Sequence, residues 1–104
     1  MSKLSLNFAA SEYDHFRDVI DGVVPVEGID LNYLRLSIEE IFARFVNFQE
    51  WEVSEMSLGK FVSLTSQESG NVIGLPVFPS RVFRQSSIYV KEDSPLNKPE
   101  DLSG

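Results

Sequence analysis

The sequence contains no cysteine and a single histidine, His15, which excludes several kinds of site at once. Without thiols there is no disulfide, no thiolate nucleophile and no cysteine-based metal centre. One histidine cannot form a site in which several histidines hold a metal ion. The sequence also lacks a glycine-rich phosphate loop and a setting for a pyridoxal lysine, and nothing calls for a flavin or a nicotinamide. We therefore expect neither a metal nor a cofactor.

Positive charge is scarce, and long apolar runs are missing. The formal net charge is -7 and the isoelectric point is near 4.5, which argues against nucleic acid or an anionic membrane as a partner. No apolar run is long enough to span a bilayer. The N-terminus alternates Leu4, Leu6 and Phe8, a pattern typical of a strand and not of a signal peptide. We expect a cytoplasmic protein, or a periplasmic one if a signal has been removed.

The 104 residues, 42% of them hydrophobic, are enough for one domain with a core. Their spacing alternates between strand and helix, and Ser37 with Glu40 predicts a capping box at the start of the clearest helix. We predict strands at residues 4–9, 29–36, 51–56, 72–77 and 87–90, with helices at 13–23, 38–46 and 58–64 and a helical turn at 100–102. This order predicts an α/β fold, an open and mostly parallel sheet with helices on both faces.

The last residues, 99–104, form a turn with no closing element after it. A complete domain usually fixes its terminal segment in a sheet or against a core. We therefore expect residues 1–104 to be a single N-terminal lobe of a longer protein, with a second lobe outside this chain. Surfaces that the missing lobe normally covers are expected to promote self-association.

A rigid turn with two cations lies between two predicted strands. It reads PVFPSRVFRQS over residues 76–86, so that Arg81 and Arg84 follow two prolines. A buried strand that opens into such a turn is a common way for open α/β sheets to build an anion site. The alternative is a surface turn with solvated arginines, or arginines paired with acidic neighbours.

Several segments resemble the 4,5-dihydroxyphthalate decarboxylase family. They are GIDL at residues 28–31, EMSL at 55–58 and PVFPSR at 76–81, with Phe83 and Arg84 just beyond. The tail KPEDLSG at 98–104 resembles a segment common in type II periplasmic-binding-protein folds, the fold group of these decarboxylases. The resemblance implies the first lobe of a two-lobed protein with the ligand between the lobes. One departure is Gln85, where the family often has histidine.

The predicted binding residues follow from the position of strand ends, since ligands of open α/β sheets bind beyond the carboxyl ends of the strands. Four stretches lie there, residues 9–15, 36–38, 55–57 and 79–84. Arg81 and Arg84 are the candidates for holding a carboxylate, because a guanidinium pairs with it through two parallel hydrogen bonds. The other predicted substrate-binding residues are Ser80, Ser57 and Ala10. For Ser57 the alternative is a plain helix cap.

The candidate catalytic residues are Glu55 and His15. Glu55 stands at the end of an apolar strand, a setting that suits a general acid or base, although it could instead pair with an arginine. His15 lies where the family also has histidine, and a structural role is its alternative. Phe8, Phe78 and Phe83 could supply aromatic surface to the site, or belong to the core.

The resemblance implies a cofactor-independent decarboxylase acting on a small aromatic dicarboxylate such as 4,5-dihydroxyphthalate. This chain would supply half of its site and would be inactive alone. The alternative is the solute-binding component of an ABC-type uptake system for a small organic anion, since a similar pocket without proton-transfer groups would bind and release its ligand.

Overall fold

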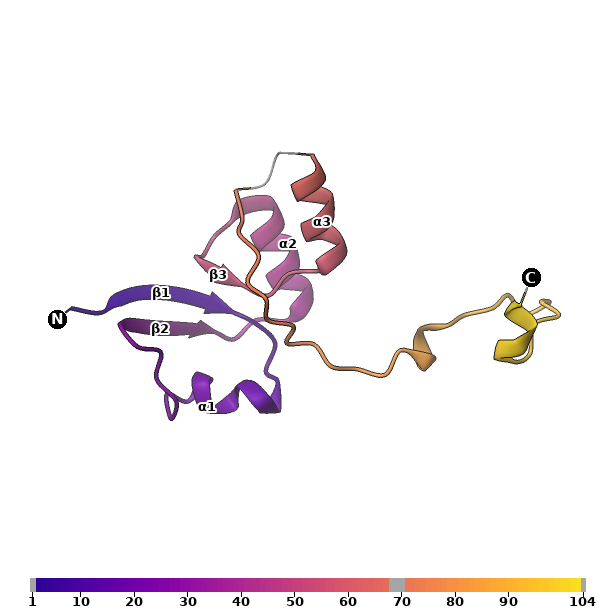
Figure 1. The fold of residues 1–104 in the computed structure, drawn as a ribbon, viewed down its shortest axis with the longest axis horizontal. Coiled ribbons are helices and arrows are strands. Elements are labelled where there is room, and N and C mark those ends of the chain that lie inside the picture. The colour runs from indigo at the N-terminus through magenta and orange to yellow at the C-terminus, as the bar shows by residue number, and fades with distance from the viewer. Residues whose placement is uncertain (1, 68–70, 104) are drawn as a thin grey trace.

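A small parallel sheet forms the centre of the molecule in the computed structural model, which describes residues 2–67 and 71–103. Its strand order is β2 (Ile29–Leu34), β1 (Leu4–Ala9), β3 (Val53–Ser54), with β1 in the middle. The first two strands pair over their full length, from Leu4 opposite Ile29 to Ala9 opposite Leu34. The third strand pairs with β1 only at Phe8 and Ala9. The predicted α/β fold with a parallel, open sheet is confirmed (Figure 1).

Helical segments lie on both faces of this sheet, as predicted (Figure 1). Successive residues of a strand point to opposite faces, so Phe8 and Ala9 serve different layers. The Phe8 ring contacts the rings of Phe16 and Tyr33 on one face, with ring centroids 6.3 and 5.8 Å away. On the other face, Ala9 is buried in a core with α2 (Ile38–Phe48).

The predicted second helix is confirmed as α2, and its apolar face forms the core. Ile41 and Phe45 are buried beside Trp51, whose ring stacks on Phe45 at 6.3 Å, and Phe42 packs against this cluster. The Ser37 side chain accepts a hydrogen bond from the Glu40 N–H (3.3 Å), which is one half of the predicted capping box. The other half is wrong, because the Glu40 carboxylate pairs with Arg44 (3.5 Å) instead.

The first helix is shorter than predicted. It consists of the 3₁₀ turn η1 (Asp14–Phe16) followed by α1 (Arg17–Ile20), and Gly22 ends it at a φ of 73°. No side chain caps its start, and the Asp14 carboxylate in its first turn pairs with Arg17 (3.1 Å). The predicted third helix is confirmed as α3 (Leu58–Ser66), although Ser57 occupies its N-cap position without a side-chain cap bond.

The predicted strands at residues 72–77 and 87–90 are wrong. Residues 72–84 have no helix or strand, and a 3₁₀ turn, η2 (Gln85–Ser87), overlaps the start of the second predicted strand. A strand requires a neighbouring strand for its backbone hydrogen bonds. The bonds described here close local turns instead, from the Val77 N–H to the Leu75 carbonyl (2.7 Å) and from the Ser87 N–H to the Arg84 carbonyl (2.9 Å). Pro76 and Pro79 have no N–H to give to a sheet.

The segment after α3 touches the core at its beginning and then leaves it. Val72 packs against the core, and a Cβ at Gly74 would lie 2.8 Å from the Phe61 ring, so this backbone passes close to α3. Beyond that, the chain extends away to the last 3₁₀ turn, η3 (Pro99–Leu102) (Figure 1). The radius of gyration is therefore 18.3 Å, above the roughly 13 Å of a compact domain of about 100 residues.

Candidate functional site

The three strands are parallel, so their carboxyl ends meet at one edge of the sheet. Ala10 follows β1, Arg35 follows β2 and Glu55 follows β3. Backbone pairing continues one step past β3, where the Glu55 N–H donates to the Ala9 carbonyl at 2.7 Å. This bond holds Glu55 beside the residues that follow β1, although they lie about 45 positions earlier in the sequence.

Glu55 is the buried acidic residue of this edge, with 9% of its surface exposed. Its Oε2 accepts a hydrogen bond from the Ser11 N–H at 2.9 Å, and its Oε1 accepts one from the Tyr13 hydroxyl at 2.5 Å. No ion pair joins Glu55 to an arginine within the described residues. The alternative in which Glu55 pairs with an arginine is therefore not observed there. A buried carboxylate with both oxygens bound to protein is held in one orientation.

Tyr13 is the residue that sequence reasoning missed. Desolvation, followed by the hydrogen bond to Glu55, raises the pKa of Tyr13. A side-chain hydrogen bond with Ser80 acts in the opposite direction and lowers it. Ser80 is therefore near the Tyr13 hydroxyl, so the turn at residues 76–86 comes close to the Tyr13–Glu55 pair. The sequence predicted Tyr13 only as the first residue of the helix at 13–23, so its hydroxyl received no role.

The Tyr33 hydroxyl donates a hydrogen bond to the Ala10 carbonyl. Ala10 is 1% exposed. The carbonyl of this predicted binding residue is thus engaged by the protein, and its contact with substrate stays a prediction. Burial, followed by the charge of Glu55 and the neighbouring Tyr13, raises the pKa of Tyr33.

His15 is exposed and lies beside the cluster formed by Ser11, Tyr13, Glu55 and Ser80. Its ring stacks on that of Tyr13 at 5.4 Å between centroids and meets the Phe16 ring edge-on at 5.1 Å. Within the described residues the imidazole forms no hydrogen bond or ion pair, so its contacts there are aromatic.

Arg81 and Arg84 are exposed and form no ion pair with a described residue. The alternative in which they pair with acidic neighbours is not seen in residues 2–67 and 71–103. Arg81 is next in the sequence to Ser80, which is near Tyr13, whereas Arg84 is three positions further along. Ser57 is exposed at the start of α3.

The three phenylalanines differ in surroundings. Phe8 is half-buried among the rings of Phe16 and Tyr33. Phe78 and Phe83 are 67% and 88% exposed, so they do not belong to the core of this chain.

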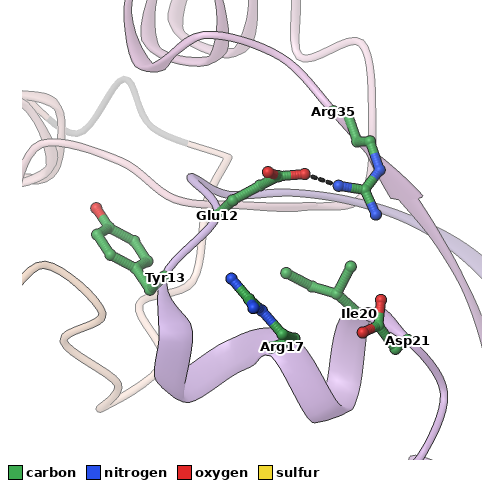
Figure 2. Close-up of a pocket in the computed structure, with 6 residues that line it drawn as sticks. All are labelled: Glu12, Tyr13, Arg17, Ile20, Asp21 and Arg35. Carbon is green, nitrogen blue, oxygen red and sulfur yellow. Dashed lines mark ion pairs between the residues drawn. The ribbon is translucent and has the colours of Figure 1, made fainter.

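A depression of about 230 Å³ lies beside Tyr13 and contains charges of both signs. Figure 2 shows the Glu12 carboxylate directed at the Arg35 guanidinium, with which it forms an ion pair, while the Tyr13 hydroxyl points away from these residues. The depression is lined by Glu12, Tyr13, Arg17, Ile20, Asp21 and Arg35. Sequence reasoning missed Arg35 because the second strand was expected to run to residue 36, two positions beyond its actual end at Leu34.

Within the described ranges, no group of three or more histidine, cysteine, aspartate or glutamate side chains is arranged to hold a metal ion. In the same part of the chain, no helix is long and apolar enough to cross a membrane.

Comparison with known proteins identifies relatives over the whole chain, although no family model matches. The chain is 41% identical over all 104 residues to a 4,5-dihydroxyphthalate decarboxylase of Comamonas testosteroni and 36% identical over the same length to one of Pseudomonas putida. The resemblance to 4,5-dihydroxyphthalate decarboxylases is confirmed. The chain spans 32% of the length of the first relative and 40% of the second.

Proposed function

We propose that this chain forms part of the active site of a decarboxylase acting on a small aromatic dicarboxylate such as 4,5-dihydroxyphthalate. The observation that carries the proposal is the similarity to two enzymes of that name over the full length of the chain. The buried carboxylate of Glu55, held at the carboxyl edge of a parallel sheet, supports it independently. The relatives are named as enzymes, so the alternative of a solute-binding protein gains no support.

The reaction replaces a carbon–carbon bond by a carbon–hydrogen bond. In 4,5-dihydroxyphthalate each carboxylate lies para to a ring hydroxyl, which donates electron density to the carbon that bears the departing group. That carbon takes a proton from an acid, and the carbon–carbon bond then breaks to release carbon dioxide and restore the aromatic ring. The protein must supply the proton and hold the retained carboxylate.

We assign proton delivery to Glu55 and binding of the retained carboxylate to Arg81. Ser80 adjoins Arg81 and is near the Tyr13 hydroxyl that binds Glu55, which supports this assignment. Arg84, Ser57 and His15 remain further candidates for contact with substrate. No cofactor is invoked. A ring carbon para to a hydroxyl can accept a proton without an external electron sink.

The test measures carbon dioxide release from 4,5-dihydroxyphthalate by the full-length protein, meaning this chain continued to the length of its relatives. We expect turnover by the full-length protein and none by residues 1–104 alone. Glu55→Gln should lower kcat by about 10²- to 10⁴-fold with little change in KM, the usual contribution of a general acid. Glu92→Gln, at an exposed position remote from the cluster, is the matched control and should leave kcat unchanged.

Absence of carbon dioxide release by the full-length protein would refute the decarboxylase function. If Glu55→Gln keeps its kcat while His15→Ala loses it, the roles assigned to these two residues are reversed. If both variants keep kcat, the proton donor lies outside this chain.

A further inference from the structure

Both carboxylate oxygens of Glu55, the atoms that can carry its proton, are bound by the protein. Glu55 is 9% exposed, and the Ser11 N–H and the Tyr13 hydroxyl each donate a hydrogen bond to one of its carboxylate oxygens. A substrate cannot replace the Ser11 N–H without moving the backbone that follows β1. The group that separates Glu55 from the surface is therefore the Tyr13 hydroxyl, 2.5 Å from Oε1.

A second hydroxyl, that of Ser80, continues this series outward. Ser80 is exposed, and its side chain lies near enough to the Tyr13 hydroxyl to lower the pKa of Tyr13. Carboxylate, phenol and alcohol thus follow one another from the buried end of β3 to a surface turn. The next residue of that turn, Arg81, carries a guanidinium that no described carboxylate neutralises.

We propose that Tyr13 is a catalytic residue that passes the proton held by Glu55 to the ring carbon of the substrate, and that Ser80 connects the pair with solvent. The proposal rests on the decarboxylase function proposed above. It names the Tyr13 hydroxyl as the group that delivers the proton.

The proton transfers balance without another reactant. When Glu55 carries a proton, its O–H donates to the Tyr13 oxygen, and the Tyr13 proton is then directed to the substrate. In the step itself the Tyr13 O–H bond breaks as the carbon–hydrogen bond forms, and the Glu55 proton moves to the Tyr13 oxygen. Glu55 is left as a carboxylate and carbon dioxide departs. Water returns one proton through Ser80 and Tyr13 to Glu55, which matches the one proton that decarboxylation consumes.

The surroundings of Tyr13 suit a relay better than a phenolate base. Desolvation and the hydrogen bond to Glu55 raise its pKa above the ordinary tyrosine value, so the hydroxyl stays protonated near neutrality. The titratable groups nearest the Tyr13–Glu55 pair are Tyr33 and His15. The charged groups of the adjacent depression are Glu12, Arg17, Asp21 and Arg35, and the Tyr13 hydroxyl points away from them (Figure 2). Arg35 is already paired with Glu12, and Arg17 with Asp14.

The experiment is a double-mutant cycle in the full-length protein, with 4,5-dihydroxyphthalate as substrate. Two residues that act as one unit show strongly non-additive effects on catalysis. We expect Tyr13→Phe to lower kcat by about a hundredfold or more at nearly unchanged KM, and the Tyr13→Phe, Glu55→Gln double variant to fall no further than Glu55→Gln. Tyr89→Phe, which changes an exposed tyrosine far along the chain, is the matched control and should keep the wild-type kcat.

A kcat of Tyr13→Phe within threefold of wild type, or losses that multiply in the double variant, would overturn the relay. Circular dichroism checks that Tyr13→Phe is folded. If it is not, Ser80→Ala decides, because this variant keeps the Tyr13–Glu55 hydrogen bond: a clear fall in kcat supports the relay and an unchanged kcat overturns it. An inactive wild-type protein refutes the decarboxylase function itself, whereas an active wild type with an active Tyr13→Phe refutes the relay alone.

Discussion

Tyr13 and Tyr33 make the stability of the chain sensitive to alkaline pH. Desolvation raises the pKa of both, and the carboxylate of Glu55 adds to this effect. A folded-state pKa above the unfolded value of about 10 means that the folded protein retains protons that the unfolded chain releases. The stabilisation is complete below pH 10 and is lost as the pH rises toward the folded-state values.

We therefore expect the free energy of unfolding to fall as the pH rises above about 10. Tyr13→Phe should flatten this fall, since phenylalanine has no proton to lose, and Tyr89→Phe should not. Urea unfolding followed between pH 7 and 11 measures the effect, and equal slopes in all three proteins would contradict it.

Arg81 is expected to hold the retained carboxylate of the substrate in the full-length protein. Loss of one partner of a desolvated charge pair costs about 2–5 kcal/mol, so Arg81→Ala should weaken binding at least roughly thirtyfold. Arg84→Ala should weaken it less, because only Arg81 adjoins the residue that contacts Tyr13. Calorimetric titration with phthalate compares the two, and an unchanged dissociation constant in Arg81→Ala removes this residue from the site.

For individual residues, the sequence predicted the position of Glu55 but not the side chains around it. Glu55 was recognisable because a carboxylate at the end of an apolar strand is unusual, and the parallel sheet places it where the carboxyl ends of the strands meet. Tyr13 and Arg35 were not, because the role of each depends on where an element ends. A helix that begins at Asp14 instead of Tyr13 leaves the Tyr13 hydroxyl free to reach Glu55.

At the scale of elements, the two N-cap serines form a natural comparison. Ser37 accepts a hydrogen bond from the Glu40 N–H, whereas Ser57 makes no side-chain cap bond at the start of α3. Loss of a functioning N-cap costs about 0.5–2 kcal/mol. Ser37→Ala should therefore lower the free energy of unfolding by about 1 kcal/mol, and Ser57→Ala by less. Chemical denaturation of both variants tests this, and a larger loss in Ser57→Ala would contradict it.

The helices were predicted better than the strands for a physical reason. The signals for α2 are local, since its cap and its apolar spacing lie within the helix itself. The backbone hydrogen bonds of a strand belong to a partner elsewhere in the sequence, so an apolar run predicts a strand only if that partner is present. Residues 72–77 and 87–90 have the composition of strands but no pairing within the described chain.

For the whole molecule, the extended segment leaves an unusual amount of apolar surface in water. Its exposed side chains are Ile73, Leu75, Val77, Phe78, Val82, Phe83, Ile88, Tyr89 and Val90. Contiguous exposed apolar surface and a short unprotected edge strand favour association. We expect the 104-residue chain to self-associate as its concentration rises. Sedimentation velocity over a hundredfold concentration range measures this.

Phe78→Asp with Phe83→Asp should shift the chain toward the monomer, because it places charges in the apolar segment without touching the core. Phe48→Asp is the matched control, since Phe48 is 72% exposed but lies at the end of α2. A chain that is monomeric throughout, or a control that dissociates it equally, would contradict this origin of association.

The hydrogen bond from the Ser11 N–H to Glu55 has a consequence for local opening of the fold. This amide follows β1 and has a side-chain carboxylate as its acceptor, so its protection from solvent exchange depends on Glu55 staying in place. Glu55 in turn is fixed by the two-residue strand β3 through its own N–H bond to Ala9. Fluctuations that detach β3 are expected to expose the Ser11 amide and separate Tyr13 from Glu55 in the same event. The deuterium exchange rate of one amide would therefore report how often the candidate acid leaves its working position.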